Sequence, residues 1–529
     1  MKIIRSIFGH YAPSATRVSA APSTQLPAVR LGRMLKLILS LVATAALLVV
    51  TPAQAKETFV IDNVQEPSSL DPHLQWNPDS YTVYRNIYDN LVTRNTSGAI
   101  APQVAAEWTI VSETEVDFTL RDDIMFHDGT ALTAADVVFS VKRITDPKFK
   151  SPQFGQFSKI TGAEATGLHS VRLTTNGPYP VLMAQLVKLS IVSKAYTENV
   201  GNAELNLKPM GSGPYKFVEW RKGVKVVLER NDTYWRGMPP FASVEFAAVP
   251  DAATRLADLR TGKADLIVGL NPDDALQLDG ISNVEVRSSP TERVGYFMMN
   301  TQAGPLADKR VRQAVSHAID RQLIIDALLG GYSEVTNQLL TPAHFGYIEG
   351  LEWYGYDPEK AKALLTEAGV GNGVEIEIIT SPRFDQRIVQ AIQQQLSDVG
   401  ITLNIAMSDM ATFLGRRRAE PEGFGDTAFG RWSCACQDAD GVLYAMFHSN
   451  SVWSKYANPE LDKYLEAGRS TLDEVERIAA YTEAHRIIFE EAPSIPLYQA
   501  AAIYGANSAL SWSPTQNESV FVMDMGWSE

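Results

Sequence analysis

One segment constrains the fold class of this chain more tightly than any other. Residues 374–379 have the pattern of a strand, residues 385–399 carry apolar side chains at helical spacing, and residues 401–405 again have the pattern of a strand. A strand, a helix and a second strand in this order form the crossover that joins two parallel strands. Strand and helix patterns alternate along the rest of the chain, so the sequence predicts an α/β protein.

Turn and capping residues mark further elements. Residues 358–367 predict a helix with Asp357 as N-cap and Pro358 at the first helical position. Residues 309–329 predict one long amphipathic helix that ends at Gly330. Other helices are predicted over residues 80–92, 133–143, 254–260 and 474–490, and other strands over residues 56–62, 116–120, 171–175, 215–220, 224–230, 265–268 and 495–498.

Length, charge and cysteine content exclude several classes of protein. The 529 residues exceed the roughly 250–300 that a single hydrophobic core supports, so more than one lobe is expected. The net charge of −14 argues against a nucleic acid or an anionic membrane as partner. Two cysteines are too few for a disulfide scaffold or for a four-cysteine zinc module.

The first 55 residues have the composition of an export signal. They contain six Lys and Arg, no Asp or Glu, an apolar run over residues 37–50 and the small-residue triplet Ala53-Gln54-Ala55. A basic flank, a short apolar stretch and such a triplet are typical of a secretory signal peptide. We expect cleavage after Ala55. Met34 would begin a signal peptide of ordinary length, so translation from Met1 or from Met34 stays open.

Removal of this leader changes the expected class of the protein. The remaining chain would carry a net charge near −20, and no second long apolar run follows. No cysteine lies near residue 55 to carry a lipid. The sequence therefore predicts a protein without a membrane anchor, exported to a periplasm.

Searches for catalytic and metal-binding motifs find nothing that predicts an enzyme. The patterns H-E-x-x-H, G-x-S-x-G and G-x-x-x-x-G-K-[ST] do not occur. The glycine-rich residues 369–373 follow a predicted helix and precede a strand, the opposite order to a phosphate-binding loop, so they predict a turn. Residues 438–441 lack the acidic positions of a calcium loop. No cofactor and no metal ion are expected.

Several short motifs in one order belong to a resemblance to a known family that runs over some 440 positions, from about residue 59 to residue 498. They are residues 66–73 (EPSSLDPH), 87–92 (IYDNLV), 118–121 (FTLR), 126–129 (FHDG), 209–215 (PMGSGPY), 305–314 (PLADKRVRQA) and 356–361 (YDPEKA). In these motifs the chain resembles the periplasmic solute-binding components of peptide/nickel-type ABC importers, known as solute-binding protein family 5.

The resemblance implies a two-lobed periplasmic-binding-protein fold, of type II and cluster C-like. Lobe I would comprise residues 56–298, with an extra subdomain at about 90–210, and the chain would return to it over residues 498–529. Lobe II would comprise residues 299–497. The two lobes would close on a ligand, and closure on ligand shifts the population between open and closed forms.

The resemblance also implies a function without catalysis. The protein would be a monomer that captures a peptide or a peptide-sized polar solute and delivers it to the transmembrane subunits of an ABC permease. Alternatives are the same role for a non-peptide ligand, such as an opine, a sugar-phosphate conjugate, a glutathione-like compound or a metal chelate, and a secreted hydrolase on this scaffold.

The expected ligand loop begins at Trp432. In dipeptide-binding relatives an Asp three residues after this Trp pairs with the α-amino group of the peptide, but this chain has Ala435 at that position. The departure speaks against simple dipeptide specificity. Trp432 would either stack on the ligand or pack in the core. The candidate ligand contacts in this loop are Trp432, Ser433, Cys434, Ala435, Cys436 and Asp438.

Cys434 and Cys436 are the two thiols of the chain, one residue apart. In an oxidising periplasm they can pair, although a bridge between residues i and i+2 demands unusual backbone bending. Two free buried thiols and part of a metal site are the alternatives.

Further candidate contacts lie outside this loop. Arg383 would pair with a carboxylate or a phosphate, or else lie at the surface. The glycine-rich turn at residues 209–215 would let backbone amides approach a ligand, or else supply positive φ angles. The candidates on the facing lobe are Glu66, Ser68, Trp76, Asn77, Met210, Ser212 and Gly213.

Overall fold

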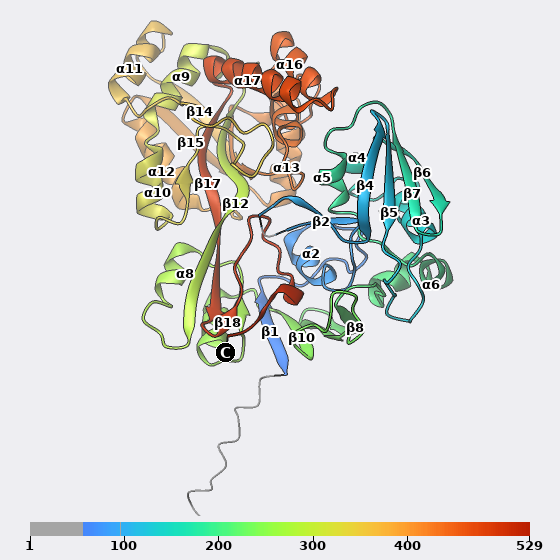
Figure 1. Cartoon of the computed structure of the whole chain (residues 1–529). Helices are drawn as coiled ribbons and strands as arrows, with labels where there is room; N and C mark the ends of the chain where they lie inside the picture. Colours follow the sequence, from blue (N-terminus) through green and yellow to red (C-terminus); the bar gives the residue numbers. More distant parts are fainter. Residues whose placement is uncertain (1–56, 96, 529) are drawn as a thin grey trace, which may run out of the picture. The chain divides into compact units, whose positions relative to one another are not determined.

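The computed structural model describes residues 57–95 and 97–528, in which strands and helices alternate throughout (Figure 1). Within those residues, eleven strands form one mixed sheet in the order β15-β14-β16-β12-β17-β11-β1-β10-β9-β8, and β13 pairs with β17 off this path. The predicted α/β class is confirmed. The predicted leader, its cleavage after Ala55 and the choice between Met1 and Met34 lie outside the described residues.

Two long antiparallel strands run through the middle of this sheet, β12 (Val284–Met299) and β17 (Ser494–Asn507). The register of their pairing shifts twice, by a small step between Gly295 and Tyr296 and by a larger one near the centre, where Pro290 pairs with Ala501 and the next pair joins Val294 to Gln499. Three residues of β12 therefore bulge opposite one residue of β17. Proline has no amide hydrogen to donate to a ladder, so a bulge is a favoured place for it within a sheet.

Each half of this strand pair carries a different set of neighbouring strands. Beside residues 284–290 of β12, β17 pairs with β11, and the sheet continues through β1, β10, β9 and β8. Beside residues 294–299, β12 pairs with β16, followed by β14 and β15, while β17 pairs with β13. The bounds are β1 (Thr58–Asn63), β8 (Tyr215–Arg221), β9 (Lys225–Arg230), β10 (Ser243–Ala248), β11 (Leu266–Ile267), β13 (Glu334–Val335), β14 (Val374–Thr380), β15 (Ile401–Met407) and β16 (Thr427–Trp432).

The strand pairing therefore builds two lobes that share β12 and β17, as Figure 1 shows. Separate hydrophobic cores accompany the two sets of strands, one containing Phe59 and Phe246 and another containing Phe297 and Ile378, all fully or almost fully buried. The predicted two-lobed fold is confirmed. The predicted lobe boundaries near residues 298 and 498 fall at the end of β12 and inside β17, and they stay predictions.

A third core lies against a second sheet, whose strand order is β4-β5-β7-β6. Its buried side chains run from Leu91 to Met210 and include Phe118 and Phe157. The elements are β4 (Ala105–Ser112), β5 (Glu115–Leu120), β6 (Ile160–Gly167), β7 (Ser170–Thr175), α3 (Ala134–Ile144), α4 (Phe154–Phe157), α5 (Leu182–Leu186) and α6 (Lys194–Leu207). We refer to this part, residues 91–210, as the subdomain.

The remaining elements complete the two lobes. In the first lobe they are α2 (Pro78–Tyr84), β2 (Val92–Arg94), β3 (Ile100–Pro102), α7 (Ala252–Arg260), α8 (Pro272–Leu276), β18 (Leu510–Ser511), η3 (Val522–Asp524) and β19 (Gly526–Trp527). In the second lobe they are η1 (Pro305–Ala307), α9 (Lys309–Ala318), α10 (Arg321–Leu328), α11 (Pro358–Glu367), α12 (Gln386–Ser397), α13 (Met410–Arg418), α14 (Pro421–Phe424), η2 (Asp440–Tyr444), α15 (Ala445–Phe447), α16 (Pro459–Arg469) and α17 (Glu474–Glu491).

The predicted crossover is present, because β14 and β15 pair in parallel and α12 joins them. The predicted cap of α11 is also confirmed, since the Asp357 side chain accepts a hydrogen bond from the backbone amide of Lys360. The glycine-rich residues 369–373 form a turn between α11 and β14, with positive φ at Gly369 and Gly373.

Three predicted elements have the wrong extent. The single helix over residues 309–329 is two helices, because Ile319 and Asp320 are extended and Asp320 caps α10 by accepting from Leu323. The helix over residues 80–92 ends at Tyr84, since later backbone groups bond distant segments, as Leu91 does with Leu189. The strand over residues 495–498 is the much longer β17, which serves both lobes.

A buried ion pair fastens the loop after β1 to α3. The guanidinium of Arg143 donates to both carboxylate oxygens of Asp71, at 2.5 and 3.0 Å, and these side chains are 6% and 0% exposed. Arg143 also donates to Asn202, and its Nη1 lies 2.9 Å from Nδ1 of His73. The EPSSLDPH motif is thereby held against the subdomain.

None of the helices in residues 57–95 and 97–528 combines the length and the apolar character that a bilayer crossing demands.

We predict that Arg143→Ala lowers the free energy of unfolding by about 3–5 kcal/mol, because it leaves the Asp71 carboxylate buried without its partner. Lys362→Ala is the matched control. It removes a cation from the exposed pair with Glu359, where a loss below about 1 kcal/mol is expected. Chemical denaturation of the two variants measures both values, and equal losses would contradict the prediction.

Candidate functional site

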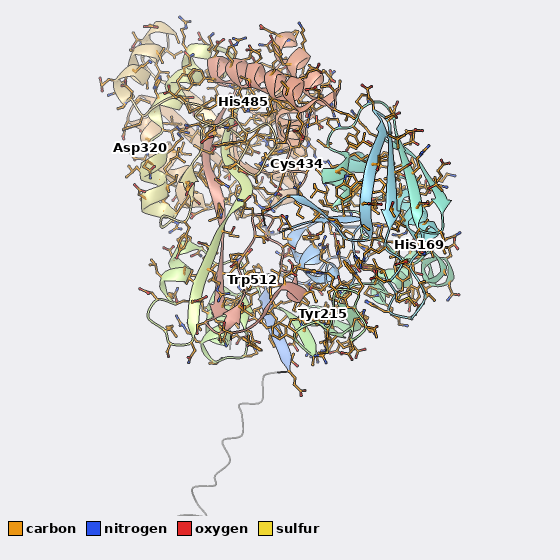
Figure 2. All side chains as sticks on the ribbon, viewed as in Figure 1. His169, Tyr215, Asp320, Cys434, His485 and Trp512 are labelled. Carbon is orange, nitrogen blue, oxygen red and sulfur yellow. A yellow bond between two sulfur atoms is a disulfide. The ribbon has the colours of Figure 1, made fainter. Side chains whose placement is uncertain are left out.

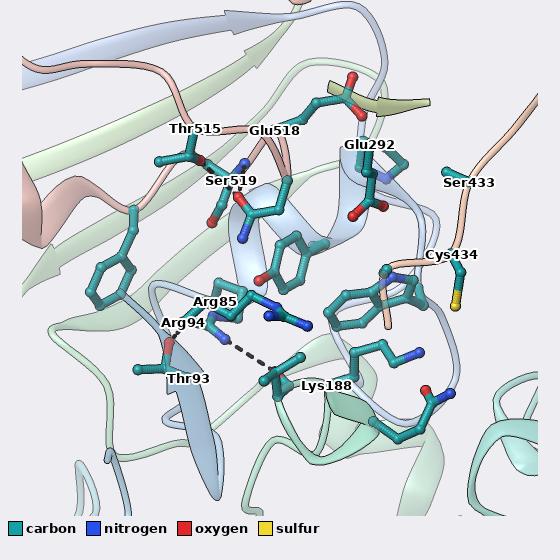
Figure 3. Close-up of a pocket in the computed structure, with 18 of the residues that line it drawn as sticks. Arg85, Thr93, Arg94, Lys188, Glu292, Ser433, Cys434, Thr515, Glu518 and Ser519 are labelled. Atoms are coloured by element: carbon teal, nitrogen blue, oxygen red, sulfur yellow. Dashed lines mark hydrogen bonds between the residues drawn. The ribbon is translucent and has the colours of Figure 1, made fainter. Parts of the chain in front are cut away.

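A cavity of about 1240 Å³ opens where the subdomain, both lobes and the C-terminal segment meet (Figure 3). Its wall includes α2 and the loop before it, β2, α4 and the loop after α5, the bulge of β12, the loop after β16, and residues 511–524. Segments far apart in the sequence therefore build one site.

The bulge in β12 points two charged residues into this cavity. Glu292 and Arg293 lie in the interrupted part of the β12–β17 ladder and line the cavity wall. Side-chain bonds stabilise the bulge, because the Thr291 hydroxyl donates to the Ala500 carbonyl and the Gln499 amide donates to the Thr291 carbonyl. The shared strand thus supplies both the joint between the lobes and part of the site.

Aromatic side chains form the apolar part of the wall. Trp76 packs on Tyr81 with ring centroids 4.3 Å apart, and Phe521 lies on the C-terminal segment. Trp432 makes an edge contact with Trp453 and donates its indole N–H to the Gly441 carbonyl. Such rings offer flat surfaces against which an aliphatic or amide-bearing ligand can pack.

Three basic side chains lie together on one side of the cavity, as Figure 3 shows for Arg85, Arg94 and Lys188. Arg85 lies over the rings of Tyr81 and Phe521, and Lys188 lies 5.7 Å from the centre of the Trp76 ring. Burial lowers the pKa of Lys188 to about 7, with Arg94 adding to the shift and Glu292 opposing it. Burial also lowers the pKa of Arg94 and raises the pKa of Glu292.

Direct bonds join the lobes beside the cavity. The Arg94 guanidinium of β2 donates to the Cys436 carbonyl of the second lobe at 2.9 Å. Arg293 forms a 2.6 Å ion pair with Glu518 and donates to the Ser433 hydroxyl. The structure therefore holds the two sides of the site in contact.

Cys434 and Cys436 are joined by a disulfide in the loop after β16. Cys434 lines the cavity, and Figure 2 labels it together with Trp512, which lines the cavity from the C-terminal segment. Gly441 packs directly against the bridge, since a Cβ on this residue would clash with both sulfurs. A glycine is therefore required where the following turn meets the disulfide.

Six of the fourteen residues predicted to touch a ligand line the cavity. They are Trp76, Asn77, Trp432, Ser433, Cys434 and Ala435. No carboxylate stands at the position of Ala435, so the departure noted in the sequence leaves this part of the wall without the acidic group expected of a dipeptide site.

The glycine-rich turn at residues 209–215 lies away from the cavity wall, and the positive φ expected there is absent. Gly211 and Gly213 are needed because a Cβ on either would clash with the Ile87 backbone. Ser212 donates to the buried Asp89, and Met210 is packed in the subdomain core. These residues hold the IYDNLV motif in place, since Asp89 also accepts bonds from Gln103, Tyr234 and Trp235.

The other predicted contacts also lie outside the cavity wall. Asp438 is buried in a 2.7 Å ion pair with Arg477, and Cys436 is buried beside it. Glu66 accepts from the Trp220 indole, while Ser68 bonds to the Ser80 hydroxyl. Arg383 is exposed and lines a second, smaller cavity of about 450 Å³.

Sequence reasoning missed the basic residues of the site, although two signals marked them. Lys188 interrupts an apolar run at residues 186–192, which is unusual unless the ammonium has a specific role. Arg85 falls four residues after Tyr81, on the same face of the predicted helix as its buried aromatic residues. No local pattern marks Arg94 or Glu292.

No group of three or more His, Cys, Asp or Glu side chains placed to hold a metal ion occurs within residues 57–95 and 97–528.

Comparison with known proteins agrees with this architecture. Residues 99–454 match the bacterial extracellular solute-binding proteins, family 5. The chain belongs to that family. The resemblance inferred from the sequence motifs is thereby confirmed, and family members are binding proteins.

Three relatives illustrate the range of the family. The glutathione-binding protein GsiB of Shigella boydii is 30% identical over 476 residues, which cover 86% of this chain and 91% of GsiB. The periplasmic binding protein DppA of Helicobacter pylori, solved with the peptide STSA, is 28% identical, with a TM-score of 0.76 over 89% of this chain and 98% of DppA. AgaA of A. tumefacien R10, solved with agropinic acid, is 26% identical, with a TM-score of 0.72 over 88% of this chain and 96% of AgaA.

We predict that Gly441→Ala lowers the free energy of unfolding by about 1–3 kcal/mol, because the added methyl group overpacks the disulfide loop. Gly415→Ala is the control, since it lies in α13 with open space around its Cβ position. Removal of a helical glycine there is expected to stabilise the protein by about 0.5–1 kcal/mol. Thermal melts of both variants test the contrast, and a neutral Gly441→Ala would contradict the packing argument.

The disulfide predicts a simple labelling pattern. Denatured protein treated with iodoacetamide should take up no label without reductant and two labels after reduction, as intact mass measures. Two labels without reductant would show free thiols, and the bridge would then be wrong.

Proposed function

We propose that the protein is the periplasmic substrate-binding component of an ABC importer. It captures a peptide or a peptide-sized polar solute between its two lobes and delivers the solute unchanged to the transmembrane subunits of a permease. The signal-like leader supports export to the periplasm. The proposal includes lobe boundaries near residues 298 and 498, a subdomain over about 90–210 and a monomeric state.

The cavity is the observation that carries this function. Its volume of about 1240 Å³ exceeds the roughly 300–1,000 Å³ of most small-molecule sites, so it can hold a solute of several residues. Its wall combines aromatic rings with charged side chains from both lobes. Such a wall can replace the hydration shell of a polar solute with fixed donors and acceptors, while the shared strands β12 and β17 allow the lobes to move as two bodies.

A non-peptide solute is the second candidate, for one specific reason. The loop that begins at Trp432 has Ala435 where dipeptide-binding relatives have an acid, so the amino terminus of a peptide lacks its usual partner there. GsiB binds glutathione and AgaA was solved with agropinic acid. A glutathione-like or opine-like solute therefore fits the same importer role.

The decisive experiment is recovery of the solute. We expect native protein, purified from its periplasm and then denatured, to release a stoichiometric small solute that mass spectrometry identifies. Incubation with a pool of peptides should return the bound members intact. Accumulation of cleaved or otherwise altered products would favour a hydrolase and contradict the proposal.

We predict that Trp432→Ala reduces the stabilisation that the recovered solute confers. A hundredfold excess over the dissociation constant should add about 2.7 kcal/mol to the wild-type protein, and a tenfold weaker variant should gain only about 1.4 kcal/mol. Trp108→Ala is the control, because this half-buried Trp belongs to the subdomain and lies outside the cavity wall. Equal gains in the two variants would remove Trp432 from the ligand contacts.

A further inference from the structure

The cavity wall carries an excess of positive charge, although the whole chain carries −14. Seven basic and four acidic side chains line it among the described residues. The basic ones are Arg85, Arg94, Lys159, Lys188, Arg236, Arg293 and Arg469, and the acidic ones are Glu292, Asp440, Glu518 and Asp524. The average composition of the protein therefore does not explain the charge of this wall.

Ion pairs within the wall neutralise only part of this charge. Arg236 pairs with Asp524 at 2.8 Å, Arg293 with Glu518 at 2.6 Å, and Arg469 with Asp440 at 3.0 Å. Glu292 is then the one acidic group of the described wall left over, against four basic groups. Its carboxylate accepts a hydrogen bond from the Gln437 amide, and burial raises its pKa.

The unneutralised cations are also short of hydrogen-bond acceptors. Arg85 and Arg94 are each bonded through their two terminal nitrogens, and Nε of both has no partner among the described residues. Lys188, which is 2% exposed, donates to the Gln156 side-chain oxygen and has no carboxylate within ion-pair distance in the described part of the chain. An ammonium has three hydrogen-bond donors and a guanidinium has five, so several donors of these three side chains have no acceptor among the described residues.

Like charges gathered in a buried place are unfavourable unless an anion compensates them. Burial is the main reason that the pKa of Lys188 is lowered, and the nearby Arg94 guanidinium lowers it further, although Glu292 opposes the shift. A carboxylate placed among the three side chains would supply both the missing charge and the missing acceptors. Charge-assisted bonds of this kind are about twice as strong as neutral ones.

We propose that the solute is acidic, a peptide or an amino-acid conjugate with at least two carboxylates and a net negative charge, and that one carboxylate sits against Arg85, Arg94 and Lys188. This inference rests on the proposed function and specifies the substrate class of the same cavity. A zwitterionic peptide without charged side chains is neutral overall, so it would leave the excess positive charge of the cavity wall uncompensated. The rings of Trp76, Tyr81 and Phe521 would flank the bound carboxylate and its aliphatic chain.

The test compares three tripeptides of matched size, Glu-Ala-Glu, Gln-Ala-Gln and Lys-Ala-Lys, by isothermal titration calorimetry. We expect Glu-Ala-Glu to bind at least tenfold more tightly than Gln-Ala-Gln and Lys-Ala-Lys to bind least. Equal or tighter binding of Gln-Ala-Gln overturns the acidic class while the importer function stands. Binding of none of the three also overturns the inference, and recovery of the native solute then decides the proposed function separately.

Single substitutions locate the carboxylate. Arg85→Gln, Arg94→Gln and Lys188→Met should each weaken Glu-Ala-Glu at least tenfold and Gln-Ala-Gln by less than threefold. Lys360→Met is the matched control for Lys188→Met, because it removes one exposed ammonium from α11, far from the cavity wall in the fold, and should change neither affinity. Equal losses for both peptides would mean that the three residues act only through the packing of the site, which contradicts the inference.

The pH dependence gives a readout that loss of packing would not imitate. The charged groups around Lys188 are Arg94 of β2, Glu292 of β12 and Arg85 after α2. Since its pKa is about 7 in the free protein and a bound carboxylate raises it, affinity for Glu-Ala-Glu should fall about tenfold between pH 6 and pH 8. The Lys188→Met variant should lose most of this change of affinity with pH. Titration of the peptide itself affects both proteins equally. An unchanged pH dependence in the variant would therefore contradict the role of Lys188.

Discussion

The long antiparallel pairing of β12 with β17 is the constraint on which the rest of the structure depends. These two strands are the only part of the described sheet that both lobes share, and every other strand joins one half of the pair or the other. After Pro290 the ladder is interrupted, and the bulge places Glu292 and Arg293 on the cavity wall. The mechanical joint and the chemistry of the site are therefore built from the same few residues.

The electrostatics of the cavity follow from that arrangement. Burial between two lobes and a subdomain removes water from the basic side chains, which lowers the pKa of Lys188 and of Arg94. Three ion pairs tie charged residues of the wall to one another, and the cations left over lie together on one side. The proposed selectivity for an anionic solute rests on this arrangement, because the fold holds the cations together before a ligand binds.

The motifs that identify the family serve the scaffold more than the ligand. Asp71 is buried in an ion pair with Arg143, and Asp89 accepts hydrogen bonds from four side chains. Gly211 and Gly213 pack directly against the Ile87 backbone, where a Cβ would clash. Local patterns predicted the crossover, the caps and most strands correctly, because each depends on neighbours in the sequence. They failed at Asp320, where a cap divides a helix, and at β17, whose length depends on strands far away in the chain.

By itself the sequence determined the α/β class and the family, since spacing, turn residues and motifs are local properties. Trp76 and Asn77, proposed for the facing lobe, and the loop from Trp432 to Ala435 line the cavity, and their contact with a ligand stays a prediction. Only the tertiary structure decided that Arg85, Arg94 and Lys188 meet, because they come from three separate segments that the folding of the first lobe and its subdomain brings together. The charge of the cavity is a property of that meeting, and a chain with a net charge of −14 gives no sign of it.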